Sequence, residues 1–309
     1  QGTLLRQTIE SIHQTVPEEL FHLVVIDHES DDPDTLAYLE TLKVNHTVLP
    51  YQGVFNFSRI NNFAVSHLGD HYPNILFLNN DIEAICTGWL ESMLDKLKRP
   101  DVGIVGAVLI YPRGAHEPDQ PRDADGNVDP DSLLTHHRIQ HAGVILGIGT
   151  AEHYLKDEIY QDPYNSHVGN SFIPLVVSRE FSAVTAACLM IRTDVFHILG
   201  GFDEALAVGF GDVDLCLRTS NRGYKVLCDG EAVLIHHESA SRSRGKDKDP
   251  HPEDSVEFLY RYRYDIERGD PFHSPLLASS TWRHRTARSP VRPKTPVYRI
   301  VTDPGIRPL

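Results

Sequence analysis

A short apolar run that ends in three small polar residues places the strongest limit on how this chain can fold. Residues 75–78 read Ile-Leu-Phe-Leu, the length of a buried strand, and Asn79, Asn80 and Asp81 follow at once. In open α/β sheets, ligands bind just beyond the carboxyl ends of the strands. A hard divalent cation that bridges phosphates binds carboxylate oxygens there. Asn and Asp are also common in ordinary turns, so a cation site and a plain turn both remain open from this segment alone.

Strand-like and helical patterns alternate along most of the chain. Strands are expected at residues 21–26, 44–49, 75–78, 102–109, 181–192, 225–227 and 232–235, and helices at 35–42, 58–67, 88–97 and 212–221. This alternation predicts an α/β fold with a mostly parallel central sheet and helices on both faces. The chain opens on a helical pattern, whereas an α/β domain usually begins with a strand. We therefore expect the first strand to be missing from it.

Composition and charge exclude several classes of function. The 309 residues are 40% hydrophobic and 23% charged, and no apolar run approaches the roughly 20 residues of a membrane-spanning helix. A net charge of -14 disfavours binding to phosphate backbones, so nucleic acid is not an expected partner. The four cysteines are scattered without a CxxC pair, which favours neither a zinc cluster nor a disulfide framework. A reducing, cytoplasmic setting is expected.

Two stretches differ from this pattern. Residues 113–138 are rich in Pro, Asp and Gly and are expected to form an acidic insertion loop on the surface. Residues 246–309 begin polar, become helical near residues 254–268 and end Pro- and Arg-rich. We therefore expect one catalytic domain over residues 1–245 and a C-terminal extension over 246–309.

Two further segments could carry chemistry. Asp212 begins an expected helix, where the helix dipole favours an ionised carboxylate; this suits a general base, but also a structural first-turn acid. Asp214 stands four residues before Arg218 and is expected to pair with it in a structural role. His236 follows an apolar strand, where an imidazole can complete an octahedral Mn²⁺ or Mg²⁺ site, although adjacent His residues usually bind no metal.

The order and character of these segments resemble family 2 glycosyltransferases of the bacterial branch that builds O-antigen and other surface polysaccharides. The resemblance extends over about residues 3 to 275. The segments that carry it are VVIDHESDDPDTLAYLETL (24–42), FNFSRINNFAV (55–65), LFLNNDIE (76–83), GWLESML (88–94), IQHAGVILGIG (139–149), SAVTAACLMIR (182–192), GGFDEALAVGFGDVDLCLR (200–218) and HHESASR (236–242). It implies the GT-A nucleotide-sugar-binding fold.

The resemblance also implies which residues bind the donor. Asn79, Asn80 and Asp81 occupy the place of the DxD motif, whose last carboxylate holds the cation against the donor diphosphate. Because the first position is Asn, Asp81 is the only anionic ligand there, and Asn79 and Asn80 are expected to shape the turn or touch the donor. Asp27 matches the acid that recognises the nucleotide, although a turn acid is the alternative. Arg59 is also expected on the donor side.

Base and metal residues are implied in the same way. Asp212 matches the catalytic Asp of the "ED" motif, the inverting general base, and His236 matches the histidine that completes the metal site. His237 and Glu238 are expected to support that site from behind. Arg242 is expected near the diphosphate, with a salt bridge as the alternative.

The chain departs from the family's pattern in three places. Gly211 stands where relatives usually carry Glu or Asn, which bears on how the acceptor is positioned. The strand that normally precedes the first helix, with its nucleotide contact, is not seen. The insertion at 114–137 is longer than the usual short turn, and either an acceptor-side lid or a surface loop fits it.

The resemblance implies an inverting, Mn²⁺- or Mg²⁺-dependent transfer of a sugar from a nucleotide-diphosphate donor, such as a dTDP- or UDP-sugar, to a hydroxyl. The acceptor is expected to be a growing glycan or a lipid-linked sugar, with peripheral association at the inner face of the membrane. One alternative is a glycosyltransferase-like domain that binds without catalysis. The other is a metal hydrolase built on His236, His237 and Glu238, although helical metalloprotease ligands are spaced at i and i+4.

Overall fold

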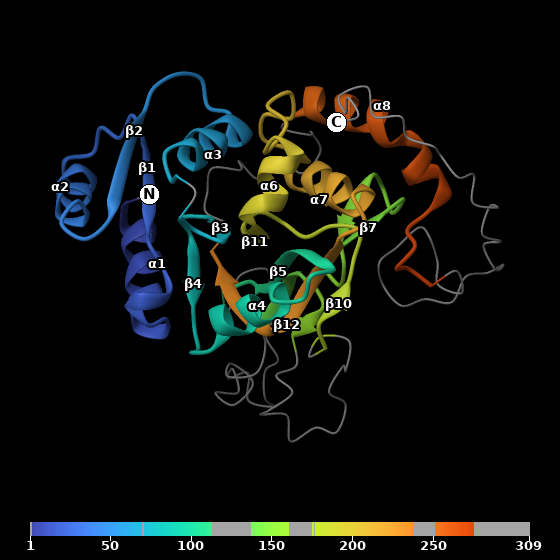
Figure 1. The fold of residues 1–309 in the computed structure, drawn as a ribbon, viewed down its shortest axis with the longest axis horizontal. Helices are drawn as coiled ribbons and strands as arrows, with labels where there is room; N and C mark the ends of the chain where they lie inside the picture. Colours follow the sequence, from blue (N-terminus) through green and yellow to red (C-terminus); the bar gives the residue numbers. More distant parts are fainter. Residues whose placement is uncertain are drawn as a thin grey trace, which may run out of the picture.

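The computed structural model describes residues 2–69, 71–112, 137–160, 175, 177–237 and 251–274. Its helices and strands follow one another along the chain as shown in Figure 1. They are α1 (Gly2–Thr15), η1 (Glu18–Leu20), β1 (Val24–His28), α2 (Pro33–Leu42), β2 (Thr47–Tyr51), α3 (Phe57–Ser66), β3 (Asn74–Leu78), β4 (Ile82–Ala84), α4 (Trp89–Leu97), β5 (Val102–Ile110), β6 (His137–His141), β7 (Val144–Leu146), β8 (Ala151–His153), β9 (Ile159–Tyr160), β10 (Arg179–Glu180), β11 (Cys188–Arg192), α6 (Thr193–Leu199), α7 (Gly211–Asn221), β12 (Lys225–His236) and α8 (Pro252–Arg268).

The central sheet is mixed, with the strand order β10-β12-β5-β11-β3 along its main path. Strands β5 and β12 pair in parallel, whereas β11 lies between β5 and β3 and is antiparallel to both. The α/β class is confirmed, but the sheet is mixed and not mostly parallel as expected. The reason is β11, which runs opposite to β3 and β5 and separates them.

Strands β1 and β2 form a separate parallel pair, joined through α2. A small apolar cluster holds this unit together and packs α1 against it; its members are Ile9, Val25, Leu39 and Leu42. In Figure 1 this unit lies at the left of the molecule, beyond β3 and β4. The large cavity described below is lined by both β1 and β3, so it lies between the two sheets.

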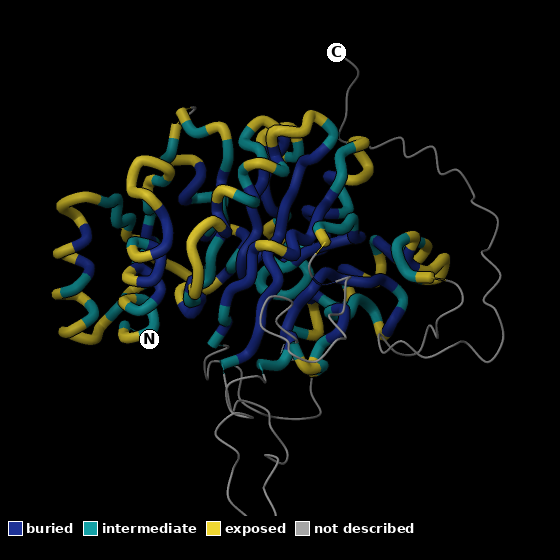
Figure 2. The backbone as a smooth tube through the Cα atoms, turned by 90° about the horizontal axis from the view of Figure 1, so that it is seen from below, coloured by how far each residue is buried: buried dark blue, intermediate teal, exposed yellow. Residues whose placement is uncertain are grey.

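Helices cover both faces of the central sheet, as the alternating pattern predicts. Strand β11 shows how: Leu189 and Ile191 join the cluster that includes α6, α7 and α8, whereas Cys188 and Met190 join the cluster that includes α1 and α4. Successive side chains of a strand point to opposite faces, and each fully buried aliphatic side chain contributes about 1.5–3 kcal/mol. Figure 2 shows the buried backbone concentrated in these central strands.

The expected strand at 181–192 is shorter than the apolar pattern indicated. Only its second half, β11, pairs in the sheet, and residues 182–187 approach β11 as an irregular segment. Gly106 of β5 lets this segment pack closely, because a Cβ at that position would lie 2.5 Å from the Val184 side chain. The amides of the segment are thereby left to hydrogen-bond side chains instead of a neighbouring strand.

Helix α8 is integrated into the core although it lies in the C-terminal part of the chain. Phe258 is fully buried and stacks on Phe210, with ring centroids 4.6 Å apart. Tyr262 donates its hydroxyl to Asp214 over 2.6 Å, and Asp214 also accepts from Arg218 over 2.7 Å, as the sequence spacing predicts. The proposed domain division at residue 245 stays a prediction. The acidic insertion lies outside the described residues except for its last two, which begin β6, and so does the Pro- and Arg-rich end.

None of the helices in the described part of the chain is both long enough and apolar enough to cross a membrane.

Candidate functional site

A cavity of about 1,040 Å³ brings together most of the residues that the sequence singles out. Its walls come from β1, β3, α1 and α3, and polar side chains from several strand and helix ends also line it. Those predicted from the sequence that line it are Asp27, Asn79, Asn80, Asp81, Asp212 and His236. These residues are up to 209 positions apart in the sequence, so the fold alone makes them neighbours.

Asp81 and His236 meet at one side of this cavity. Asp81 Oδ1 lies 3.1 Å from His236 Nε2, and both residues are nearly buried, with 8% and 9% of their surface exposed. Asp81 lies three residues after the end of β3 and directly precedes β4, and β4 pairs with the end of β12, where His236 is opposite Ile82. Backbone pairing thus fixes the distance between the carboxylate and the imidazole.

Gln140 determines which nitrogen of His236 is available. The side-chain oxygen of Gln140 accepts a hydrogen bond from His236 Nδ1 over 2.5 Å, and Gln140 is itself 6% exposed. With the proton held at Nδ1, the lone pair of Nε2 faces Asp81. Histidines that bind metals almost always have their second nitrogen held in this way.

His237 stabilises the chain on either side of Ile82. Its backbone N–H donates to the carbonyl oxygen of Asp81 over 2.9 Å, and its ring Nε2 lies 2.8 Å from Glu83. Gln7 of α1 donates to the same carboxylate over 2.8 Å. The rings of His236 and His237 therefore have different partners and do not converge on one point.

The donor set of one carboxylate oxygen and one imidazole nitrogen suits Mn²⁺ or Mg²⁺. Such ions are commonly held by one or two protein ligands, with phosphate oxygens and water completing the octahedron. Within the described ranges, no cluster of three or more His, Cys, Asp or Glu side chains forms a complete metal cage. Asp81 and His236 thus fit an ion that is shared with a bound phosphate group.

Asp212 lies in the first turn of α7, and both of its carboxylate oxygens are held by backbone amides. Oδ2 accepts from Ala186 N–H over 2.9 Å, and Oδ1 accepts from Val213 N–H over 2.8 Å. The helix N-terminus places a positive partial charge beside this carboxylate. The geometry gives an oriented carboxylate at the cavity wall, which is what a general base requires.

The loop before α7 is held by an acid that sequence analysis did not identify. Asp254 of α8 is 5% exposed, and its carboxylate accepts from the N–H groups of Ala207, Val208 and Gly209 over 2.7–3.0 Å. The chain then passes through Phe210 in the left-handed conformation, with φ of 62°. Backbone strain of this kind persists only where its surroundings enforce it.

The presence of glycine at position 211 has a steric explanation in this chain. A Cβ at this position would lie 2.9 Å from Ser58 Oγ, and Ser58 is fully buried at the start of α3. Ser58 also donates to the Leu206 carbonyl over 2.6 Å. Close packing of α3 against the loop that leads into Asp212 thus takes the space that a side chain at residue 211 would need.

The remaining predicted residues that the structure describes do not contact Asp81, His236 or Asp212 in any of the interactions described above. Asp27 lines the cavity, and its Oδ1 accepts from Ser30 N–H over 3.1 Å, which makes a turn at the end of β1. Arg59 is not among the residues that line the cavity; its Nε pairs with Glu204 over 2.8 Å. Glu238 and Arg242 lie outside the described residues.

A pair of histidines near the cavity was also missed by sequence analysis. His141 ends β6 and is fully buried, whereas His153 ends β8 and lines the cavity. Their Nδ1 atoms are 2.7 Å apart and their rings meet at 84°. Burial is the main reason that the pKa of His141 lies well below its usual value near 6.5, and the nearby His153 and His236 lower it further.

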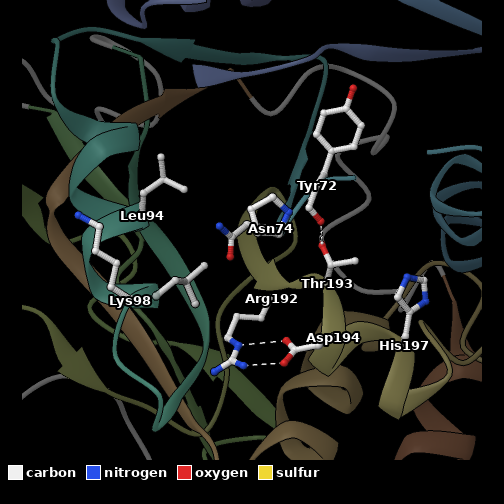
Figure 3. A pocket seen from close by; sticks show the side chains of 10 residues that line it. Tyr72, Asn74, Leu94, Lys98, Arg192, Thr193, Asp194 and His197 are labelled. Atoms are coloured by element: carbon white, nitrogen blue, oxygen red, sulfur yellow. Dashed lines mark hydrogen bonds and ion pairs between the residues drawn. The ribbon is translucent and has the colours of Figure 1, made fainter. Parts of the chain in front are cut away.

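A second, smaller hollow of about 550 Å³ lies where β3 begins and β11 ends (Figure 3). It is lined by Asn74, the first residue of β3, and by Arg192, the last residue of β11. Arg192 there forms a two-point ion pair with Asp194. The second cation of this hollow, Lys98, pairs with Asp95. Both cations are thus already matched by acids, and none of the predicted site residues that the structure describes lines the hollow.

No protein-family model matches the chain. It is 33% identical over 241 residues to the O-antigen biosynthesis protein RfbC of Myxococcus xanthus, and 35% identical over 246 residues to the uncharacterized protein y4gI of Sinorhizobium fredii. Each match covers 77% of this chain but only 16% and 23% of the respective relatives. The chain thus corresponds to less than a quarter of these longer proteins.

The fold also matches a crystal structure of GalNAc-T7 with UDP, GalNAc and Mn²⁺. The TM-score is 0.60 at 14% identity, over 86% of this chain and 47% of the other. The expected GT-A fold is confirmed by this likeness. The expected resemblance to proteins of O-antigen biosynthesis is confirmed by the match to RfbC.

Replacing Gly211 with Ala is expected to destabilise the protein by about 1–3 kcal/mol, because the new methyl group overpacks against Ser58. The measurement is the free energy of unfolding in urea. Ser58→Gly, introduced together with Gly211→Ala, should recover part of the loss by vacating the space. A Gly211→Ala variant as stable as the wild type would contradict the steric explanation.

Stability is expected to fall as the pH drops below about 6.5, with His141 contributing up to about 1.4 kcal/mol per pH unit. Folded His141 stays neutral because its pKa is lowered, whereas His141 of the unfolded chain takes up a proton near pH 6.5. Urea unfolding between about pH 7.5 and about pH 5.5 measures this. His141→Asn should flatten the dependence, while His67→Asn, at an exposed position, serves as the control. An equal slope in both variants would contradict the assignment.

Proposed function

We propose that this chain is the catalytic part of an inverting, metal-dependent glycosyltransferase. The observation that carries the proposal is the arrangement of Asp81, His236 and Asp212 around one cavity. The first two form the proposed cation-binding pair, and the third is an oriented carboxylate that comes from another element, α7. Charge neutralisation and proton removal can then act on two parts of one bound substrate.

Asp81 and His236 would hold Mn²⁺ or Mg²⁺ against the donor diphosphate. When bound, the ion supplies Lewis-acid stabilisation of the departing diphosphate. The residues of the chain provide the geometry: pairing of β4 with β12 fixes the two ligands, and Gln140 keeps the proton of His236 on Nδ1. Asp27, Asn79 and Asn80 line the same cavity. Asp27 is assigned to the nucleotide, and Asn79 and Asn80 to the turn or to the donor sugar.

Asp212 would act as the general base. Its carboxylate removes the proton of the acceptor hydroxyl as that oxygen attacks the anomeric carbon on the face opposite the diphosphate, which inverts the configuration. Hydrogen bonds from Ala186 and Val213 keep both oxygens oriented, and each oxygen retains a lone pair for the incoming proton.

The proposed substrates rest on the family resemblance and on the names of the similar proteins. The donor is proposed to be a nucleotide-diphosphate sugar, with a UDP- or dTDP-sugar as the first class to test. The acceptor is proposed to be a hydroxyl of a growing surface glycan or a lipid-linked sugar. The relative RfbC is named for O-antigen biosynthesis, and the fold neighbour carries UDP and Mn²⁺.

The metal-hydrolase alternative is disfavoured by the arrangement of the two histidines. His236 faces Asp81 and Gln140, whereas His237 faces Glu83, so the rings cannot share one ion. The alternative of a binding domain without catalysis predicts nucleotide binding without turnover. Turnover measurements therefore separate it from the proposed enzyme.

The test is a panel of UDP-, GDP- and dTDP-sugars, with and without Mn²⁺, read out as released nucleoside diphosphate. We expect turnover with at least one donor and a requirement for the cation. Asp212→Asn should lower turnover by about 10²–10⁴-fold, because the base is lost, while nucleotide binding persists.

Asp95→Asn is the matched control, because Asp95 is an exposed acid of α4 that pairs only with Lys98 among the described ion pairs. It should retain wild-type turnover. Unchanged turnover in Asp212→Asn would contradict the base assignment, and nucleotide binding without turnover by the wild type would favour the binding-domain alternative.

A further inference from the structure

The hydrogen bonds around His141 determine where its proton lies. His141 Nε2 is 3.3 Å from both the Gly143 amide and the Thr185 amide. Both amides can only donate, so Nε2 accepts and carries no proton. The neutral ring of this fully buried residue therefore has its proton on Nδ1.

The position of that proton sets the state of His153. His141 Nδ1 is 2.7 Å from His153 Nδ1, so His141 donates and His153 accepts. The proton of neutral His153 must then be on Nε2, on the side of the ring away from the buried His141. The two rings meet at 84°, which also fixes the plane of the His153 ring. His153 is thus an imidazole held in one tautomer and one orientation.

This imidazole is linked to the proposed reaction centre on two sides. Thr185 N–H donates to His141, and the next amide, Ala186 N–H, donates to Asp212. On β6, Gln140 binds His236 while the adjacent His141 binds His153. His153 lines the cavity together with both Asp212 and His236. Hydrogen bonds and adjacent backbone positions therefore connect His153 to Asp212 and to His236.

We propose that His153 recognises a hydroxyl group of the transferred sugar, donating to it from Nε2. The inference rests on the proposed function, because it requires a sugar bound between the cation pair and the base. A neutral donor fixed in direction suits a single hydroxyl oxygen, whereas the many oxygens of a diphosphate favour a cation. A site built to bond one hydroxyl rejects analogues that lack it.

The kinetic test compares His153→Phe, His153→Gln and the wild type on the donor found in the panel and on its monodeoxy analogues. His153→Phe should lower kcat/KM for the full donor about tenfold, the loss of one hydrogen bond. With one monodeoxy analogue, the wild type and His153→Phe should be equal. His153→Gln, whose amide can donate near the Nε2 position, should recover most of the activity.

The controls separate recognition from a general effect on the cavity. His197→Phe, in the second hollow, should behave as the wild type. Binding of UDP with Mn²⁺, measured by calorimetry, should be the same in His153→Phe as in the wild type. An equal loss on every monodeoxy analogue, or a loss of UDP binding, would overturn the role of His153 and leave the proposed function standing. Absence of both turnover and nucleotide binding in the wild type would contradict the proposed function and this inference with it.

A spectroscopic test needs no substrate. In ¹⁵N-histidine NMR spectra, His141 should show a proton on Nδ1 and His153 a proton on Nε2. His153→Phe should remove one of these patterns and so identify it. The reverse tautomers, or a charged His153 at neutral pH, would overturn the proposal whatever the kinetics show.

Discussion

The contact between Asp81 and His236 is the interaction on which the rest of the site depends. It joins the end of β3 to the end of β12, two strands that are separated in the sheet by β5 and β11. The short strand β4 makes this possible because it turns back from Asp81 and pairs with the last residues of β12. A carboxylate oxygen and an imidazole lone pair that face each other over 3.1 Å repel without a cation between them, so the backbone pairing must hold them in place.

The other wall of the site is held by backbone amides and buried side chains. The irregular segment 182–187 binds His141 through Thr185 and Asp212 through Ala186. Asp254 of α8 then fixes the loop that leads into Asp212. Asp212 is therefore positioned by groups from β6, from the approach to β11 and from α8.

Local sequence pattern was sufficient to predict some of these features. Asp81 follows a clear apolar strand, Asp212 begins a helix, and His236 ends a strand, so the place of each in the fold is recognisable from its immediate neighbours. Their expected roles came from the family resemblance, because the local pattern also fitted structural roles. The spacing of Asp214 and Arg218 likewise predicted their ion pair, which the structure contains. In each case the information lies within a few residues of the position itself.

The features that could not be predicted depend on partners that are distant in the sequence. Gln140 acquires its role from His236, which is 96 positions away, and Asp254 from amides 45–47 positions away. The antiparallel course of β11 and the irregular path of 182–187 come from tertiary pairing, which an apolar run does not encode. Gly211 is similar, because only the approach of Ser58 explains it.

The central claim is that Asp81 and His236 together bind the catalytic cation. Electron spin-echo measurements on Mn²⁺ bound with UDP test it directly, because a directly coordinated imidazole nitrogen gives a characteristic ¹⁴N coupling. The account predicts this coupling in the wild type, its loss in His236→Gln and weaker Mn²⁺ binding in Asp81→Asn. Mn²⁺ that binds with UDP but shows no nitrogen coupling in the wild type would contradict it.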